Sequence, residues 1–329
     1  MTFSEKDIPD LSGKVIIVTG LYPSISLLLL LLFSDVFTYQ TGGNSGIGKQ
    51  TVAVLASKGA KVYLTARSEE KYNKAVEEIR VSHPDSTKGE IKWLKLELGS
   101  AKGAKEAAEE FKSKESALHV LYNNAGIMGS PKGSLSPDGY ELQWATNVFG
   151  LFVFTHHLLP LLEATAASSP PGTVRIINTS SDGASQAPKT GIPLADPTVG
   201  SQSGKFACYG HSKIGVILIT RQLAKRYPQI WSFAPHPGPV QSELTRNVGI
   251  PGPVMWVLNR VLFKPVQYGA LTQLFAGTAP DIDASKNGSY LIPLAKFESK
   301  MPHAQCEDDA FGEKVWEWNM TAMEKAGAA

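Results

Sequence analysis

The chain has 329 residues, 43% of them hydrophobic and 19% charged, which is the composition of an ordinary globular protein with a sizeable core. The formal net charge of +2 gives no electrostatic reason to expect a nucleic-acid partner. Two cysteines, Cys208 and Cys306, make neither a disulfide framework nor a zinc cluster, and we predict no metal site. The polar N-terminus resembles neither a signal nor a transit peptide, so we expect a cytoplasmic protein.

Short apolar runs alternate along the chain with segments of helical periodicity. The runs, which we expect to be buried strands, cover residues 14–20, 61–67, 91–98, 118–126, 172–181, 229–238 and 288–293. The helical segments cover residues 47–59, 69–80, 100–114, 144–164 and 209–227. Strands that are apolar throughout and separated by helices form a parallel sheet covered on both faces. We therefore predict one doubly wound α/β domain, a Rossmann fold over residues 1–329, with ligands outside the carboxyl ends of the strands.

A glycine-rich turn, TGGNSGIG at 41–48, opens the first predicted helix. Glycines let the backbone approach a pyrophosphate, and the helix N-terminus offers free N–H groups and a positive dipole. The competing interpretation of this spacing alone is a turn with a helix cap. The residues expected at the cofactor phosphates are Gly20, Gly43, Asn44, Ser45, Gly46, Ile47 and Gly48.

Two further motifs carry groups that could do chemistry. The sequence YGHSK puts Tyr209 and Lys213 one turn apart on one helix face. A nearby ammonium group lowers the pKa of a tyrosine from its solution value of about 10, which makes Tyr209 a candidate proton donor or acceptor. Ser180 and Ser181 emerge at the carboxyl end of the fifth strand, where a hydroxyl could hold a substrate oxygen. In isolation, each serine is better explained as a cap or turn residue.

Taken together, the motifs follow one order along the chain. That order is the glycine-rich loop, NNAG at 123–126, Asn147, Ser181, Tyr209 with Lys213, and HPGPV at 236–240. In this order the chain resembles a short-chain dehydrogenase/reductase over nearly its whole length. The segments VYLTARSEEK, LYNNAGIM and HPGPVQSEL are similar to the retinol-dehydrogenase-like branch, and the tail GSYLIPLAKF resembles that of microbial members.

The resemblance implies a role for each matching residue. Tyr209 would move the proton to or from the substrate oxygen, Lys213 would lower the pKa of that tyrosine and hold the nicotinamide ribose, and Ser181 would orient the carbonyl or hydroxyl. Asn147 would hold a water in the proton relay. The residues expected along the cofactor are Glu97 and Leu98 at the adenine, Asn124, Ala125 and Gly126 in the cleft, and Pro237, Gly238, Val240 and Ser242 by the nicotinamide.

Cofactor preference depends on the end of the second strand, where an acid favours NAD and an arginine favours the 2′-phosphate of NADP. The sequence there is TARSEE, so Arg67 comes first after the strand, and Lys49 follows the glycine loop. We therefore predict NADP(H). NAD(H) is the alternative, because Glu69 lies near the spacing of a ribose-binding acid. Glu97 departs from the family, which usually has aspartate at that position.

The stretch 237–265 is rich in proline and glycine and is predicted to be a substrate loop with a short apolar helix at 253–263. If that helix has a functional role, it would be a lid over an apolar substrate or a peripheral membrane contact. If its role is only structural, it would cover the edge of the core. The spacing from Ser181 to Tyr209 is longer than in many family members, although it is typical of the retinol-dehydrogenase-like branch. The sequence does not predict an oligomeric state.

An anomalous insert at 21–42 separates the first strand from the glycine-rich turn. Its apolar core, Leu27 to Phe33, is far shorter than the roughly 20 residues that span a bilayer, so we predict no transmembrane segment. Removal of the insert joins Gly20 to Gly43 and restores the family pattern, VIIVTGGNSGIG. The dipeptide Thr-Gly occurs at both junctions and the excised codons keep the reading frame. We therefore hypothesise a retained intron or a wrong gene model.

With the insert present, two registers compete for the first strand. VIIVT at 15–19 is apolar throughout, as a central parallel strand should be, whereas DVFTYQT at 35–41 would put a tyrosine or glutamine in the core. The main functional prediction is an NADP-dependent enzyme that interconverts an alcohol and a carbonyl on a small apolar molecule. The alternative is a cofactor-impaired relative, inactive or binding-only, because the insert splits the dinucleotide-binding turn. The spacing of GGNSGIG disfavours a sugar-nucleotide epimerase.

Overall fold

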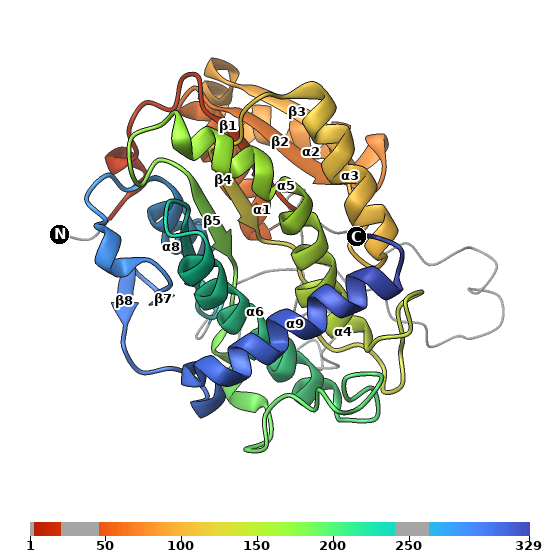
Figure 1. Ribbon diagram of the computed structural model, residues 1–329. Helices are drawn as coiled ribbons and strands as arrows, with labels where there is room; N and C mark the ends of the chain where they lie inside the picture. Colours follow the sequence, from red (N-terminus) through yellow and green to blue (C-terminus); the bar gives the residue numbers. More distant parts are fainter. Residues whose placement is uncertain (1–2, 21–45, 241–262) are drawn as a thin grey trace.

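The computed structural model describes residues 3–20, 46–240 and 263–329, which form one sheet with helices on both faces (Figure 1). The spatial order of the strands is β3-β2-β1-β4-β5-β6-β7-β8. The strands that pair in parallel are β1 (Val15–Val18), β2 (Lys61–Ala66), β3 (Glu90–Lys95), β4 (Val120–Asn123), β5 (Arg175–Asn178), β6 (Trp231–Pro235) and β7 (Tyr290–Ile292). The last strand, β8 (Lys296–Glu298), pairs antiparallel with β7.

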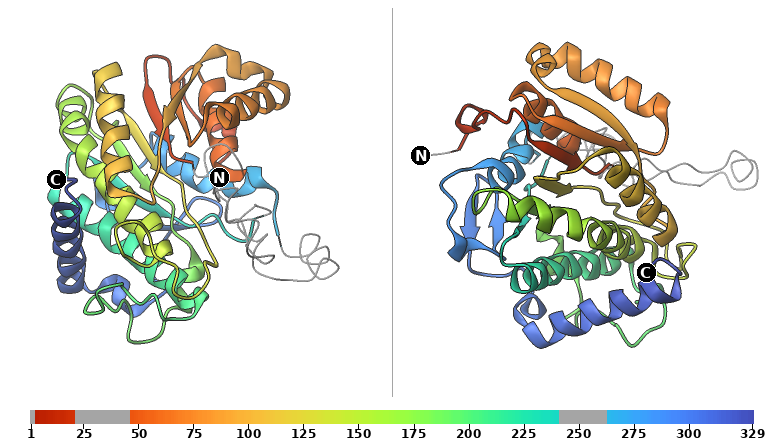
Figure 2. Two further views of the ribbon diagram at one scale, coloured as in Figure 1. Left: turned by 90° about the vertical axis from the view of Figure 1, so that its right-hand side faces the viewer. Right: turned by 45° about the horizontal axis from the view of Figure 1, so that its top comes forward.

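Helices connect successive parallel strands, as a sheet of this kind requires. They are α1 (Gly46–Ser57), α2 (Glu69–Ser82), α3 (Ala101–Lys114), α4 (Leu142–Trp144), α5 (Gly150–Ala167), α6 (Lys205–Arg226), α8 (Val266–Thr278) and α9 (Asp309–Lys325). One core cluster packs α1, α2 and α8 on one face of the sheet, and a second packs α3, α5 and α6 on the other (Figure 2). The predicted doubly wound α/β fold is confirmed.

The first strand is the apolar run VIIV. β1 lies at the centre of the sheet between β2 and β4, and all four of its side chains are buried. Val15 and Ile17 enter the core cluster on one face, while Ile16 and Val18 enter the cluster on the other. A strand buried on both faces needs apolar residues at every position, which this run supplies. The competing run 35–41 and the insert 21–42 lie outside the described residues.

One long helical stretch follows β4. It runs from Leu142 to Ala167 and is apolar and long enough to cross a membrane by those two criteria, but 78% of its apolar window is buried inside the fold. It is therefore a core helix, on the face of the sheet that α3 and α6 also cover. The stretch is interrupted at Ala145–Phe149 by a π-helical turn, in which the Gly150 N–H donates to the Ala145 carbonyl five residues back.

The sequence did not predict the helices α8 and α9 or the strand β8. α9 lies across α6 and also contacts α5 (Figure 1). The Trp318 ring on α9 packs edge-on against Tyr140, Trp144 and Phe149, with ring centroids 4.8, 5.6 and 6.0 Å away. The C-terminal helix therefore packs against residues just before the π-helical turn and against the last residue of that turn.

Candidate active site

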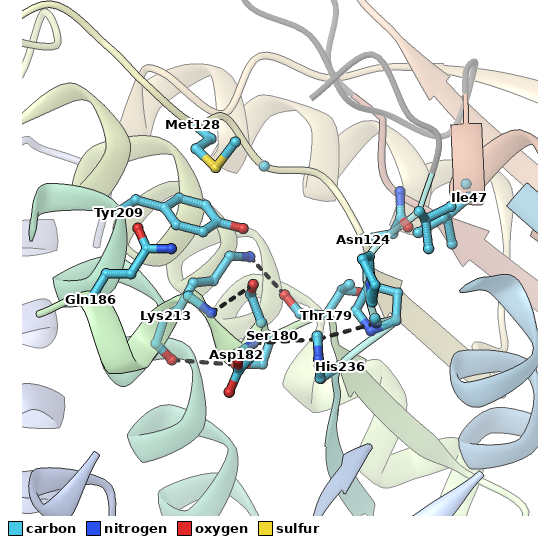
Figure 3. A pocket seen from close by; sticks show the side chains of 18 of the residues that line it. Ile47, Asn124, Met128, Thr179, Ser180, Asp182, Gln186, Tyr209, Lys213 and His236 are labelled. Carbon is cyan, nitrogen blue, oxygen red and sulfur yellow. Dashed lines mark hydrogen bonds between the residues drawn. The ribbon is translucent and has the colours of Figure 1, made fainter. Parts of the chain in front are cut away.

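A cavity of about 400 Å³ opens at the carboxyl ends of β4, β5 and β6 (Figure 3). Ten of the predicted site residues line it, namely Ile47, Gly48, Asn124, Gly126, Ser181, Tyr209, Lys213, Pro237, Gly238 and Val240. They come from segments far apart in the sequence, and the parallel sheet brings them to one edge. This is the place where a doubly wound fold binds its ligands.

Tyr209 and Lys213 are both buried on α6, with exposed fractions of 4% and 5%. The Lys213 ammonium lies over the Tyr209 ring, 5.5 Å from its centroid. Its Nζ donates a hydrogen bond of 2.9 Å to the carbonyl of Thr179 at the end of β5 (Figure 3). The helical spacing therefore does bring the phenol and the ammonium into one site, and a strand-end carbonyl fixes the lysine.

Burial dominates the ionisation of both groups. It raises the pKa of Tyr209 to about 12, and a hydrogen bond with the Ser181 side chain opposes that rise. It lowers the pKa of Lys213 to about 8, because a charged ammonium loses its hydration in the interior. The expected lowering of the Tyr209 pKa by Lys213 is therefore wrong for these groups by themselves. The desolvation of the phenol is the larger effect.

Ser181 begins a short 3-10 helix, Asp182–Gln186, as its N-cap. Its Oγ accepts a hydrogen bond of 3.0 Å from the Gly183 N–H, which fixes the hydroxyl beside the Tyr209 ring. Gly183 permits that approach, since a Cβ there would lie 2.5 Å from a carbon of the Tyr209 ring. The Ser181 turn and Tyr209 therefore pack directly against each other.

Asn147 lies in the π-helical turn, and both polar atoms of its side chain are hydrogen-bonded. Its Oδ1 accepts from the Ile127 N–H at 2.7 Å, and its Nδ2 donates to the Ile127 carbonyl at 2.9 Å and to Ser212 Oγ at 3.0 Å. The amide therefore ties the segment after β4 to α6. Single π-helical turns inside α-helices are frequent at functional sites. The predicted role of Asn147 in holding a water stays a prediction, because its Oδ1 can accept a second hydrogen bond beside the one from Ile127.

The segment after β4 is also tied to the end of β1. The Ala125 N–H donates to Thr19 Oγ1 at 3.0 Å, and Asn124 Nδ2 donates to the Thr19 carbonyl at 3.3 Å. Gly126 stands where a Cβ would lie 3.2 Å from Asn147 Oδ1. These contacts hold NNAG along one wall of the cavity, and the glycine leaves room there for the Asn147 amide.

Positively and negatively charged side chains both lie at the predicted adenine end of the site. The Arg67 Nε lies 3.9 Å from Glu97 Oε1, and burial lowers the pKa of the guanidinium. Burial and then the neighbouring Arg67 charge lower the pKa of Lys71 on α2. Lys49 forms an ion pair with Glu78 on α2 instead of joining this group. Glu69 is exposed in the first turn of α2, and Leu98 is buried.

A hydrogen-bonded chain that the sequence did not predict links Lys213 to α1. Thr179, whose carbonyl holds Lys213, donates from its Oγ1 to Gln273 Oε1 at 3.0 Å. Gln273 is 1% exposed on α8 and donates to Thr51 Oγ1 on α1 at 2.6 Å. No sequence signal pointed to Gln273, because its helix was not predicted and its partners are distant in the chain.

Comparison with known proteins now gives the family. A family model described as short chain dehydrogenase matches residues 38–194. A short-chain dehydrogenase/reductase of Armillaria gallica is 38% identical over 318 residues, covering 96% of this chain and 92% of that protein. The chain belongs to the short-chain dehydrogenase/reductase family. An uncharacterized oxidoreductase of Schizosaccharomyces pombe is also 38% identical, covering 97% of this chain and 87% of its own length.

Solved structures agree on the fold. An uncharacterized protein of Mycobacterium paratuberculosis superposes with a TM-score of 0.69 at 22% identity, covering 98% of each chain. RhlG of Pseudomonas aeruginosa, in a complex with NADP, superposes with a TM-score of 0.62 at 24% identity, covering 86% of this chain and 95% of its own. This short-chain dehydrogenase/reductase therefore shares its Rossmann fold with these structural neighbours.

The family match begins inside the insert. It starts at residue 38, whereas the central strand of this short-chain dehydrogenase/reductase is Val15–Val18. The first strand and the rest of the family pattern are thus separated by the residues that the sequence marked as anomalous. Four predicted site residues, Gly43, Asn44, Ser45 and Ser242, lie outside the described residues, as does most of the predicted substrate loop.

Several side chains of the cavity were missed by sequence reasoning. Asp182 follows the serine pair directly and His236 precedes the predicted Pro237, so adjacency to a motif was a usable signal for both. Met128 and Gln186 come from connecting segments without a pattern of their own. Ser180 was named with Ser181 as a candidate, and the cavity-lining residues absent from the predicted site are Met128, Thr179, Asp182, Gly183, Gln186, His236, Pro239 and Phe263.

Proposed function

We propose that this protein is an NADP(H)-dependent oxidoreductase that interconverts an alcohol and a carbonyl on a small apolar molecule. The observation that carries the proposal is the convergence of Tyr209, Lys213 and Ser181 on one cavity at the carboxyl edge of the sheet. Apolar side chains such as Met128, Val240 and Phe263 line the same cavity and suit an apolar substrate. The coarser activity, oxidoreductase of the short-chain family, follows from the relatives.

The residues present fit a nicotinamide dinucleotide. Glycines at 48, 126 and 238 line the cavity, and they leave room for a cofactor against the backbone. The start of α1 offers backbone N–H groups to phosphates. Arg67 at the end of β2 supports NADP over NAD, since an arginine there suits a 2′-phosphate. The bound NADP of the similar RhlG structure supports the same preference.

The chemistry divides between cofactor and protein. Bound nicotinamide supplies or accepts the hydride. Tyr209 moves the proton at the substrate oxygen, and the Ser181 hydroxyl orients that oxygen. Burial holds the pKa of Tyr209 near 12, so the phenol is protonated at neutral pH and can donate its proton. Lys213, held by the Thr179 carbonyl, lies beside the phenol and compensates negative charge there.

Replacement of Tyr209 by phenylalanine is expected to lower kcat by about 10²- to 10⁴-fold, because the proton at the substrate oxygen loses its donor. NADPH affinity and the melting temperature should change little, since only the hydroxyl is removed. Steady-state reduction of a panel of apolar ketones and aldehydes, with NADPH oxidation followed by absorbance, measures the effect. The matched control is Tyr122→Phe, the same change in a buried tyrosine of β4 that does not line the cavity. Equal activity of Tyr209→Phe and wild type would refute the assignment.

Deletion of residues 21–42 tests the alternative of a cofactor-impaired relative. The deletion joins Gly20 to Gly43 and closes the phosphate-binding turn. We expect it to tighten NADPH binding by at least about tenfold, since the backbone N–H groups of a closed turn are preorganised for phosphate. Fluorescence titration of the full chain and the deletion with NADPH and with NADH measures both affinity and preference. Equal affinity of the two proteins would refute the view that the insert damages the turn, and tighter NADH binding would refute the NADP assignment.

A further inference from the structure

His236 joins two of the turns that line the cavity. Its Nδ1 accepts a backbone hydrogen bond from Asp182, at 3.3 Å, and another from Gly238, at 3.2 Å. Asp182 begins the short helix that Ser181 caps, and Gly238 follows Pro237 after β6. The imidazole itself lines the cavity (Figure 3). A single ring nitrogen therefore holds the serine turn to the proline-glycine turn.

The same two bonds fix the protonation state of the ring. A nitrogen that accepts hydrogen bonds carries no proton, so neutral His236 must be the Nε2–H tautomer. A second proton would have to enter at Nδ1, where it would face two N–H donors. The ring is also fixed from the side: it stacks parallel to Tyr290 of β7, with an interplanar angle of 1° and centroids 6.5 Å apart. The site is thus built for a neutral imidazole.

The surroundings of the His236 ring include groups that raise its pKa and groups that lower it. Burial is the largest influence and lowers the pKa of His236. The Asp182 carboxylate on the serine turn raises that pKa, and the Lys213 ammonium on α6 lowers it. Tyr290 on β7, which stacks on the ring, has a pKa raised by burial, so its phenol is neutral at neutral and acidic pH. The net effect keeps the ring neutral to a lower pH than a histidine in water.

We propose that His236 is a positioning residue of the reaction: its neutral imidazole clamps the Ser181 turn to the Pro237-Gly238 turn, and protonation of the ring opens the clamp. The proposal rests on the function proposed above, because Ser181 orients the substrate and Gly238 lies in the predicted nicotinamide wall. It goes beyond that function by giving the site an acid limit that neither Tyr209 nor Lys213 supplies. The step takes up one proton from solvent at Nδ1; it breaks the two hydrogen bonds to that nitrogen and no covalent bond.

The first test does not depend on activity. Two-bond ¹H–¹⁵N correlation spectra of the full chain report the tautomer and titration of each histidine, and the His236→Asn variant identifies the His236 signal by its absence. We expect the Nε2–H tautomer at pH 7.5 and a titration midpoint below the usual 6.5. An Nδ1–H tautomer, or a midpoint at or above 6.5, would overturn the clamp even if the protein proves to be an active reductase.

The second test separates positioning from mere stability. His236→Leu removes the acceptor and leaves two N–H groups unpaired, so we expect kcat/KM to fall about tenfold or more at every pH. His236→Asn offers an amide oxygen near the place of Nδ1 and cannot titrate, so it should recover most of that loss and lack the acid limb of the wild-type profile. An unchanged acid limb in His236→Asn would contradict the proposal.

The matched control is His119→Asn. His119 precedes β4 at the opposite end of the sheet, its Nδ1 likewise accepts a backbone N–H, from Val15 at 3.1 Å, and burial likewise lowers its pKa. The variant therefore makes the same substitution at a similar hydrogen bond far from the cavity, and the acid limb of kcat/KM should stay as in the wild type. Loss of the limb in both variants would assign it to general destabilisation in acid and would overturn the clamp.

Discussion

Lys213→Met is expected to abolish the reaction and yet to stabilise the folded protein at neutral pH. Lys213 is 5% exposed, and burial lowers its pKa from 10.5 to about 8. A shift of that size corresponds to a cost of about 3 kcal/mol for keeping the ammonium charged in the fold. Methionine fills a similar volume without the charge. It gives up the hydrogen bond to the Thr179 carbonyl, worth about 1 kcal/mol.

The sign of the pH dependence follows from proton binding. Between pH 8 and 10.5 the unfolded chain holds the lysine proton and the folded chain releases it, so wild-type stability rises with pH across that window. Below pH 8 both states are protonated and the full cost remains. The stability advantage of Lys213→Met should therefore be largest at pH 7 and should nearly vanish by pH 10.5.

Urea unfolding at pH 7 and pH 10 measures this difference, and NADPH-dependent reduction measures the loss of activity, which we expect to exceed about 100-fold. Lys225→Met is the matched control, because Lys225 is exposed on the same helix. It should change stability by less than about 0.5 kcal/mol at either pH. A Lys213→Met protein that is less stable than wild type at pH 7 would show that the charge is well accommodated in the fold.

Trp316→Ala is expected to lower the free energy of unfolding by about 3–5 kcal/mol, the usual loss when a buried tryptophan is truncated. Trp316 is 7% exposed on α9 and packs edge-on against Phe152 of α5, with centroids 4.9 Å apart. The guanidinium of Arg226, at the end of α6, lies 4.6 Å from the Trp316 ring centroid. One side chain thus holds α9 on two core helices, and its removal leaves a large cavity between them.

Chemical denaturation followed by circular dichroism provides the measurement. The next residue supplies the control: Glu317 is exposed, and Glu317→Ala should stay within about 0.5 kcal/mol of wild type. A loss below about 1 kcal/mol for Trp316→Ala would mean that α9 is a dispensable appendage. Domains of this kind have a total stability of about 5–15 kcal/mol, so a loss of the expected size puts the folded state at risk.

The sequence predicts the central strands of the sheet well because they are buried on both faces. Val15–Val18 and Ile176–Ile177 are apolar runs that fit only a central strand. The C-terminal part was missed for physical reasons. β8 has three residues, too few for any periodicity to show. α9 is rich in charge on its exposed face, and the apolar positions that bury it make sense only against α5 and α6.

The candidate site likewise contains residues that the sequence predicts and contacts that it does not predict. Tyr209, Lys213 and Ser181 were predictable because each stands in a local motif whose element carries it to the sheet edge. The Gln273 chain and the His236 clamp were not, since both consist of contacts between residues dozens of positions apart. The ionisation of Tyr209 was predicted in the wrong direction because the sequence shows which charge is near but not how deeply the phenol is buried.

The π-helical turn at Ala145–Phe149 sets the angular phase between two halves of one long helix. Each residue of an α-helix advances about 100° around the axis, and a π-helical turn accommodates one residue beyond the α-helical repeat. Side chains before and after it are thus offset by roughly that angle from an uninterrupted helix. Asn147 can therefore reach Ile127, which lies between the cavity-lining Gly126 and Met128, while Phe152 and Phe154 still face the core. Deletion of any one residue in this turn would rotate one half of the helix against the other, so its length is as constrained as its composition.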